Sequence, residues 1–143
     1  MQQIDYNAIR LIRYSRLIDQ AILTRRYSLA TQMAYRCLLE YHRLFLRFVL
    51  PQTLIVKRNA FQLSVLTVKH LRTRQKLTVR RARQLFDMLR GTYYITHMSS
   101  TTVGDRDLHV DLATATYARD QALAISKFLF GSLSEESERA SLR

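Results

Sequence analysis

Glycine and proline are scarce in this chain, which has three glycines and one proline in 143 residues. A β-sheet protein of this size needs a turn about every 8–12 residues, and such turns rely heavily on these two residue types. Long helices need far fewer turns, and the length suits one domain. The sequence therefore predicts an all-α fold, a single-domain bundle of about five helices.

Apolar residues recur every three or four positions, which is typical of helices with one buried face. Pro51 should end the second helix and Gly131 the fifth, while Thr78 is a candidate N-cap for the fourth, which should fray near Gly91. The first two helices should form an antiparallel pair. The expected helices span about 5–23, 28–50, 54–73, 78–91 and 108–130.

The same spacing predicts which residues face the core. The expected buried stripes are Ile4, Ala8, Leu11, Ser15, Ile18 and Ile22; Ala30, Ala34, Cys37, Tyr41, Leu44 and Phe48; Ala82, Leu85, Leu89 and Tyr93; and Ala115, Ala118, Ala122, Ile125 and Leu129. The third helix is less clear from its pattern, because residues 54–56 and 63–68 are rich in β-branched side chains and short strands are an alternative there.

Two segments lack the helical pattern. Residues 98–107 are polar and favour a loop, since Ser, Thr and Asp side chains compete for backbone hydrogen bonds. Residues 133–143 are rich in Ser and Glu without a sustained apolar stripe. We therefore expect a helical-bundle domain over residues 1–132 and a flexible polar tail over 133–143.

Charge is distributed unevenly along the chain. Residues 1–100 hold 18 Lys and Arg against 4 Asp and Glu, whereas residues 101–143 hold 5 against 7. Such a positive field attracts nucleic acid, anionic lipid or an acidic protein, and nucleic acid is the commonest of these partners. The single cysteine, Cys37, cannot form an intramolecular disulfide, and no secretory signal or long apolar run is evident. The sequence thus predicts a cytoplasmic protein without a membrane span.

Seven cations and no acid lie between Lys69 and Arg83. Like charges at this density repel one another unless a polyanion neutralises them, so we interpret the run as a phosphate-binding patch that contacts backbone more than bases. Two arginines one turn apart on the second helix could extend it, although an acidic protein would suit them equally. The candidate nucleic-acid-binding residues are Lys69, Arg72, Arg74, Lys76, Arg80, Arg81, Arg83, Arg43 and Arg47.

Other chemistry finds little support in the sequence. There is no glycine-rich phosphate loop, and one cysteine with four scattered histidines does not form a zinc-site pattern. We expect no metal site and no cofactor.

Two segments carry a resemblance to a known family. Residues 23–43 have Leu23, Tyr27, Ala30, Ala34 and Tyr35 at spacings that resemble the start of HEPN domains, which are small helical bundles associated with RNA. Residues 88–94 resemble the family's late Leu-Arg segment, which is followed by Tyr, a polar loop and an Ala-rich final helix. The resemblance implies a HEPN-like bundle.

HEPN ribonucleases carry an Arg and a His with four to six residues between them, and two pairs here have that spacing. Arg90 and His97 lie where the family usually places the pair, although Gly91 stands where a polar residue is favoured. Arg36 and His42 lie within the second helix, where Glu40 has a spacing that suits ordinary surface pairing with Arg36 or Arg43.

The resemblance also implies a mechanism. In HEPN ribonucleases two protomers bring their sites together, and the ribose 2′-hydroxyl attacks the neighbouring phosphate without a metal ion. By that resemblance the candidate catalytic residues are His97 for proton exchange, Arg90 for holding the phosphate and Tyr94, or alternatively Tyr93, for orienting the substrate. A homodimer, and often a nucleotidyltransferase antitoxin as partner, would be expected of a toxin or defence component.

Three functions therefore remain open. The first is a HEPN-like protein that binds RNA, either with or without metal-independent endoribonuclease activity. The second is a non-catalytic helical subunit of a ribonucleoprotein or protein complex, whose partner is RNA or an acidic protein. The third is a small DNA-binding protein, in which residues 78–90 would act as the reading helix.

Overall fold

The computed structural model describes residues 3–55, 57–75, 78–100 and 110–141, with side chains described for 8–51, 53–55, 57–74, 78–94 and 110–131. Five α-helices account for most of this, and the described residues contain no strand. The predicted all-α bundle of about five helices is confirmed. The helices are α1 (Gln3–Leu23), α2 (Tyr27–Val49), α3 (Ala60–Gln75), α4 (Val79–Ser100) and α5 (Leu112–Ser141), with a short 3-10 turn at Gln52–Leu54.

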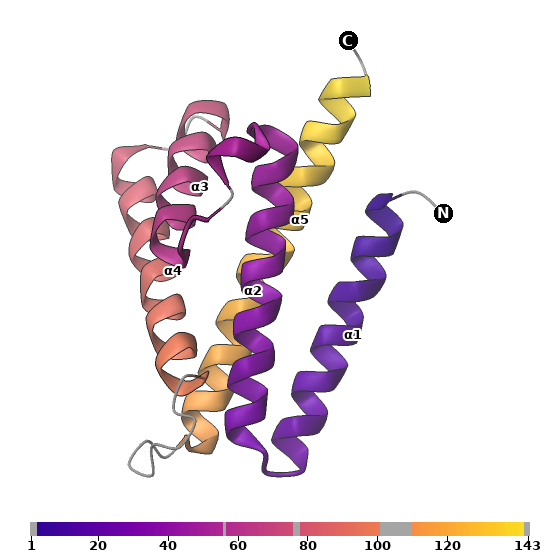
Figure 1. Cartoon of the computed structure of the whole chain (residues 1–143), viewed down its shortest axis with the longest axis vertical. Helices are drawn as coiled ribbons and strands as arrows, with labels where there is room; N and C mark the ends of the chain where they lie inside the picture. The colour runs from indigo at the N-terminus through magenta and orange to yellow at the C-terminus, as the bar shows by residue number, and fades with distance from the viewer. Residues whose placement is uncertain (1–2, 56, 76–77, 101–109, 142–143) are drawn as a thin grey trace.

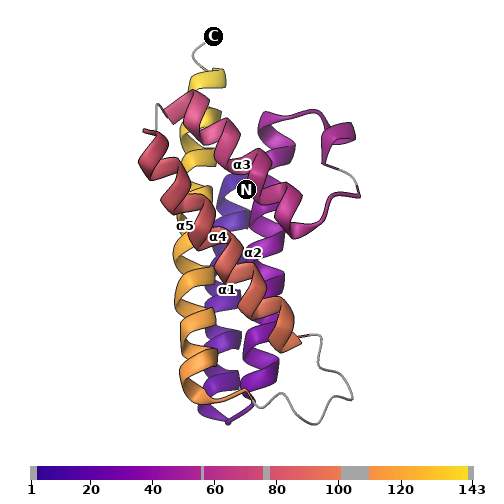
Figure 2. The same cartoon turned by 90° about the vertical axis from the view of Figure 1, so that its left-hand side faces the viewer.

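Helix α2 lies at the centre of the bundle and packs against each of the other four helices. Figure 1 shows α1 on one side of the α2 and α5 pair, with α3 and α4 on the other side. Figure 2, turned by a quarter, shows α3 and α4 as the near layer with α1 behind. The predicted pairing of α1 with α2 is confirmed, and the most extensive contact is that between α2 and α5.

Small residues make that contact possible. Ala30 and Ala34 of α2 and Ala115, Ala118 and Ala122 of α5 are fully buried. Alanine faces let two helix backbones approach closely, whereas a larger side chain in such a packed seam typically costs about 1–3 kcal/mol through overpacking. Larger side chains fill the rest of the core, namely Ile18, Leu38, Phe45, Leu46, Leu63, Leu71, Leu89 and Leu129.

The helix ends explain where the chain turns. After α1 the N–H of Arg26 donates to the Ala21 carbonyl at 2.8 Å, and Arg25 adopts a φ of 61°. This is a Schellman-type end, for which glycine is the usual residue. Thr78 is the N-cap of α4, as predicted, and accepts the Arg81 N–H at 3.2 Å. Asp111 accepts the Thr114 N–H at 2.8 Å, so α5 begins after Asp111 and not at Leu108.

The fourth helix was expected to fray near Gly91 and the fifth to end at Gly131, and both expectations are wrong. Helix α4 continues through Gly91 to Ser100, and α5 continues through Gly131 to Ser141. A Cβ at either glycine would meet nothing within 4 Å, so each occupies an open position along its helix. Glycine inside a helix costs only about 1 kcal/mol relative to alanine, which the flanking helix-forming residues can offset.

Those continuations change two further expectations. Residues 98–100 of the expected loop belong to α4, and the rest of that loop lies outside the described residues. The segment 133–141 of the expected tail is helical as part of α5. The third helix is shorter than predicted, because Ile55 is buried in a connection and α3 begins only at Ala60. There Asn59 and Gln62 cap the helix reciprocally, at 2.8 and 3.1 Å.

One predicted core residue is also wrong. Phe48 is 47% exposed, whereas Phe45 and Leu46 are fully buried. Because α2 has neighbours on several sides, its buried arc is wider than a single stripe and near its C-terminal end turns toward α3. Spacing alone does not show which arc a central helix buries.

Candidate polyanion-binding surface

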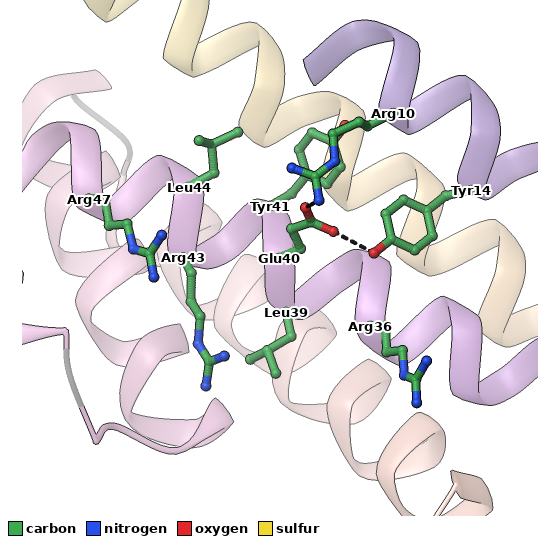
Figure 3. A pocket seen from close by; sticks show the side chains of 9 residues that line it. All are labelled: Arg10, Tyr14, Arg36, Leu39, Glu40, Tyr41, Arg43, Leu44 and Arg47. Atoms are coloured by element: carbon green, nitrogen blue, oxygen red, sulfur yellow. Dashed lines mark hydrogen bonds and ion pairs between the residues drawn. The ribbon is translucent and has the colours of Figure 1, made fainter. Parts of the chain in front are cut away.

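A pocket of about 370 Å³ lies between α1 and α2 and is lined mainly by arginine and tyrosine. We call it the arginine pocket, and Figure 3 shows its lining. Helix α1 contributes two of its residues and α2 contributes the other seven. The lining residues are Arg10, Tyr14, Arg36, Leu39, Glu40, Tyr41, Arg43, Leu44 and Arg47.

The helical register of α2 brings the charged residues of this pocket into one row. Arg36, Glu40, Arg43 and Arg47 follow one another at steps of four, three and four residues, which places them on one helix face. All three arginines are exposed. Figure 3 shows Arg36 and Arg43 pointing away from α1. Their guanidinium groups are therefore available to a ligand that lies along α2.

Glu40 is the one acid among the lining residues, and it turns toward α1. Its carboxylate pairs with Arg10 and accepts a hydrogen bond from the Tyr14 hydroxyl. Burial, together with that bond to Glu40, raises the pKa of Tyr14 well above its ordinary value. The expected pairing of Glu40 with Arg36 or Arg43 is thus replaced by a contact across helices. The negative charge is held by α1, while the arginine row faces outward.

A second basic region surrounds the connection from α3 to α4, and we call it the basic turn. Six of its seven predicted residues are described and all six are exposed, whereas Lys76 lies outside the described residues. In the described part of the chain none of the six forms an ion pair, and they are Lys69, Arg72, Arg74, Arg80, Arg81 and Arg83. Figure 1 shows the C-terminal end of α3 and the N-terminal end of α4 at the same end of the bundle as the C-terminal end of α2.

His70, which the sequence places inside that basic run, does not join the surface. Its ring packs edge-on against Phe45, with ring centroids 5.6 Å apart. The run therefore separates into exposed cations and one partly buried aromatic ring.

Arg90 and Tyr94 line a different pocket, on the α3 and α4 side of α2. Arg90 is exposed and lies 5.9 Å from the centroid of the Phe86 ring, and Tyr94 is 67% exposed. This aromatic pocket measures about 340 Å³. It is lined by Tyr35, Asn59, Ala60, Phe61, Ser64, Arg90, Tyr93 and Tyr94.

Position 97 lies within α4, so the expected catalytic residues share one helix. Residues 90, 94 and 97 are related by steps of four and three, and the helix brings such positions to one face over about two turns. The side chain of His97 lies outside the described residues.

The second Arg and His pair is divided by the fold. Six residues correspond to about 600° around a helix, so Arg36 and His42 point in directions about 120° apart. Arg36 faces the arginine pocket, whereas His42 is fully buried, with Nδ1 2.6 Å from the Tyr93 hydroxyl oxygen and 3.2 Å from the Leu38 carbonyl oxygen. Burial lowers the pKa of His42 to about 4, and the contact with Leu38 opposes this shift. This histidine is a neutral core residue and shares no site with Arg36.

Sequence reasoning predicted part of the arginine pocket. Arg43 and Arg47 were expected to extend the basic run, and the structure shows that they also line a pocket with Arg10 and Tyr14 of α1. Arg10 and Arg13 do fall outside the apolar stripe of α1, and Arg13 lies beside this pocket with Arg10, Tyr14 and Leu17. The sequence thus indicates that these two arginines lie on the polar face of α1. That this face lies beside the arginines of α2 depends on how the two helices pack.

Comparison with family models, curated proteins and solved structures found no match. In the part of the chain that the structure describes, no group of three or more His, Cys, Asp or Glu residues is placed to hold a metal ion. Among the same residues no helix has both the length and the apolar character needed to cross a membrane.

Proposed function

We propose that this protein binds RNA, with the phosphate backbone lying along α2 in the arginine pocket. The observation that carries the proposal is the exposed row of Arg36, Arg43 and Arg47, beside which the single acid is held by α1. The basic turn extends the positive surface at the same end of the bundle.

Repulsion between the arginines of the row favours a polyanionic ligand. Arg43 and Arg47 stand one helical turn apart, and a pair of like charges at that spacing destabilises a helix by about 0.2–0.5 kcal/mol. A polyanion removes this repulsion and releases its own counterions, which favours binding at moderate salt. Arginine suits the task because its planar guanidinium can donate two parallel hydrogen bonds to one phosphate.

The lining of the pocket favours a nucleic-acid strand over an acidic protein or a DNA duplex. The partly exposed ring of Tyr14 lies among the arginines, with Leu39 and Leu44 also in the lining, whereas Tyr41 is buried and offers no ring face. Proteins that hold single strands combine a positive groove with aromatic rings, because every base offers a flat face for stacking. An acidic protein surface gains less from such rings.

The test is fluorescence anisotropy of labelled single-stranded RNA over a salt series, with duplex DNA and polyglutamate as competitors. For Arg43→Gln we expect weaker binding and a salt slope reduced by about 0.7, the value for one lost phosphate contact on a single strand. Lys127→Gln removes the same charge from an exposed position on α5 and should leave the slope unchanged. Equal effects of the two variants, or preferential displacement by polyglutamate, would refute this site.

RNA cleavage is a narrower proposal, supported by the helical continuation of α4. The residues that resemble the HEPN pair, Arg90 and His97, stand two turns apart on one face with Tyr94 between them. In this proposal the ribose 2′-hydroxyl gives up its proton as its oxygen bonds to phosphorus, the bond from phosphorus to the 5′-oxygen of the next nucleotide breaks, and the departing 5′-oxygen takes up a proton, which leaves a 2′,3′-cyclic phosphate.

Cleavage can be separated from binding on one gel. Wild-type protein and the variant Arg90→Ala/His97→Ala would be incubated with the same RNA in EDTA. Cleavage by the wild type alone supports the narrower proposal, whereas retardation without cleavage by both proteins leaves a binding protein and removes the catalytic assignment.

A further inference from the structure

The aromatic pocket lies where α2 meets α3 and α4, and its composition differs from that of the arginine pocket. It is bounded by Tyr35 and Tyr93, whose rings meet edge-on with centroids 5.9 Å apart, and by Phe61 and Tyr94. Phe61 is 51% exposed and Tyr94 is 67% exposed, so two ring faces remain accessible. The pocket is mostly apolar, with the Arg90 guanidinium as the one charged group among its lining residues.

We propose that the aromatic pocket holds one unstacked base of the bound RNA, with Phe61 and Tyr94 as stacking surfaces and Arg90 on the adjoining phosphate. This inference rests on the proposed RNA binding and adds a subsite to it. A volume of about 340 Å³ is at the lower end of the range for small-molecule pockets and accommodates a group of nucleoside size. Base-to-ring stacking tolerates any base sequence.

The two pockets adjoin each other on α2. Tyr35 lines the aromatic pocket and Arg36, the next residue, lines the arginine pocket, with Cα atoms about 3.8 Å apart. Arg43, two turns further along α2, lines the arginine pocket with Arg36, and its positive charge partly opposes the rise in the pKa of Tyr93 that burial causes. A strand whose phosphates lie on Arg36 and Arg43 therefore has a base within reach of the aromatic pocket.

The N-terminus of α3 also borders the pocket but does not define its ligand. The Gln62 N–H donates to the Asn59 side chain at 2.8 Å, and the Asn59 N–H donates to the Gln62 side chain at 3.1 Å. These two backbone donors are already engaged within the chain, and Arg90 is the charged group in the lining that can contact a phosphate. The rings supply most of the contact area, as expected for a base and not for a free anion.

The experiment compares two oligonucleotides that differ only in their bases. Labelled ten-nucleotide oligouridine and an abasic oligoribonucleotide of equal length would be titrated by anisotropy into the wild type, Phe61→Leu and Phe128→Leu. Phe128 is 45% exposed on α5 and so provides a matched control. Circular dichroism would confirm that each variant is folded.

We expect Phe61→Leu to weaken oligouridine binding about tenfold, with an unchanged salt slope, because stacking releases no counterions. Binding of the abasic strand, and all binding by Phe128→Leu, should remain at the wild-type level. Photocrosslinking with 5-iodouridine should join the RNA to peptides that contain Phe61 or Tyr94.

Each other result has a distinct meaning. Failure of the wild type to bind either oligonucleotide overturns the proposed RNA binding and the subsite with it. Normal RNA binding that Phe61→Leu leaves unchanged, with no crosslink at Phe61 or Tyr94, overturns the base subsite alone and favours an aromatic side chain of a partner protein there. Equal loss of abasic and oligouridine binding would also overturn it, because Phe61 would then act on the phosphate contacts.

Discussion

The two faces of α2 treat their polar residues in opposite ways. On the outer face Arg36, Arg43 and Arg47 are exposed, and Glu40 is paired with Arg10 of α1. On the inner face His42 is fully buried against Tyr93. Glu40 and His42 are only two residues apart, but Glu40 forms an ion pair at the surface whereas His42 belongs to the core.

This difference shows how helical register decides the chemistry of a motif. Arg36 and His42 match an Arg-to-His spacing in sequence, but six residues turn them about 120° apart. Arg90 and position 97 are seven residues apart, so their directions around the helix axis differ by only about 20°. In a continuous helix, an Arg and a His with five residues between them therefore point in different directions. With six residues between them, they lie on the same face.

The largest expected effect on the inner face is the dependence of the unfolding free energy on pH. The unfolded chain protonates His42 near pH 6.5, whereas the folded chain does so only near pH 4. Because the unfolded state takes up the proton first, the free energy of unfolding falls as the pH drops from 6.5 to 4. At about 1.4 kcal/mol per pKa unit this contribution amounts to about 3 kcal/mol.

Urea unfolding at pH 7, 5.5 and 4 measures this loss. His42→Asn can still place a polar atom near the Tyr93 hydroxyl but does not titrate, so its unfolding free energy should vary less with pH by that amount. An equally steep pH dependence in the variant would assign the loss to other groups and break the contrast between the two faces.

A smaller effect is expected for Tyr93→Phe. The change removes a buried hydroxyl whose oxygen lies 2.6 Å from His42 Nδ1, and His42 Nε2 already has no hydrogen-bond partner in the described part of the chain. Because the Leu38 carbonyl still faces Nδ1, we expect a loss of about 1–2 kcal/mol in urea unfolding. Tyr117→Phe, at a position 41% exposed, should change stability by less than about 0.5 kcal/mol. Equal losses would mean that the hydroxyl of Tyr93 is not held by the core.

The outer face should respond to Glu40→Gln in binding more than in stability. Glu40 is 27% exposed, and ion pairs with partly exposed groups contribute at most about 1 kcal/mol. The same change removes the acid beside the arginine row and releases Arg10, so RNA affinity should rise about threefold at moderate salt. A loss of affinity would show that the hold of Glu40 on Arg10 and Tyr14 shapes the pocket for its ligand.

Much of this fold could be predicted from the sequence because apolar spacing records which side of each helix is buried. Leu11 and Ile18 of α1 and Ala118 and Ile125 of α5 are buried as expected. The prediction was wrong at Phe48, where the packing of a central helix and not its own spacing decides burial. It was wrong at Gly91 and Gly131 because a single glycine lowers helix stability without ending a helix.

The candidate site was less accessible to sequence reasoning. The density of cations identified the basic turn, because residues close in sequence carry it. The arginine pocket joins Arg10 to Arg43 and Arg47, and only the packing of α1 on α2 brings them together. The same holds for the aromatic pocket, whose lining comes from α2, the start of α3 and α4. The number of charges can be counted from the sequence, whereas the pockets in which they are brought together depend on tertiary contacts.

The smallest effect is expected at Cys37, on the inner face. Its thiol is buried, its sulfur lies 3.6 Å from the Ser126 hydroxyl oxygen, and burial raises its pKa to about 12. A thiol reagent needs both access and thiolate, so native protein at pH 8 should react only as fast as it opens. Phe48→Cys adds an exposed thiol to the same helix, and that variant should show one fast and one slow thiol in an Ellman assay, both becoming fast in urea. Two fast thiols in the native variant would mean that the inner face of α2 opens readily. Cys37 would then be buried on average but exposed to solvent often enough to react.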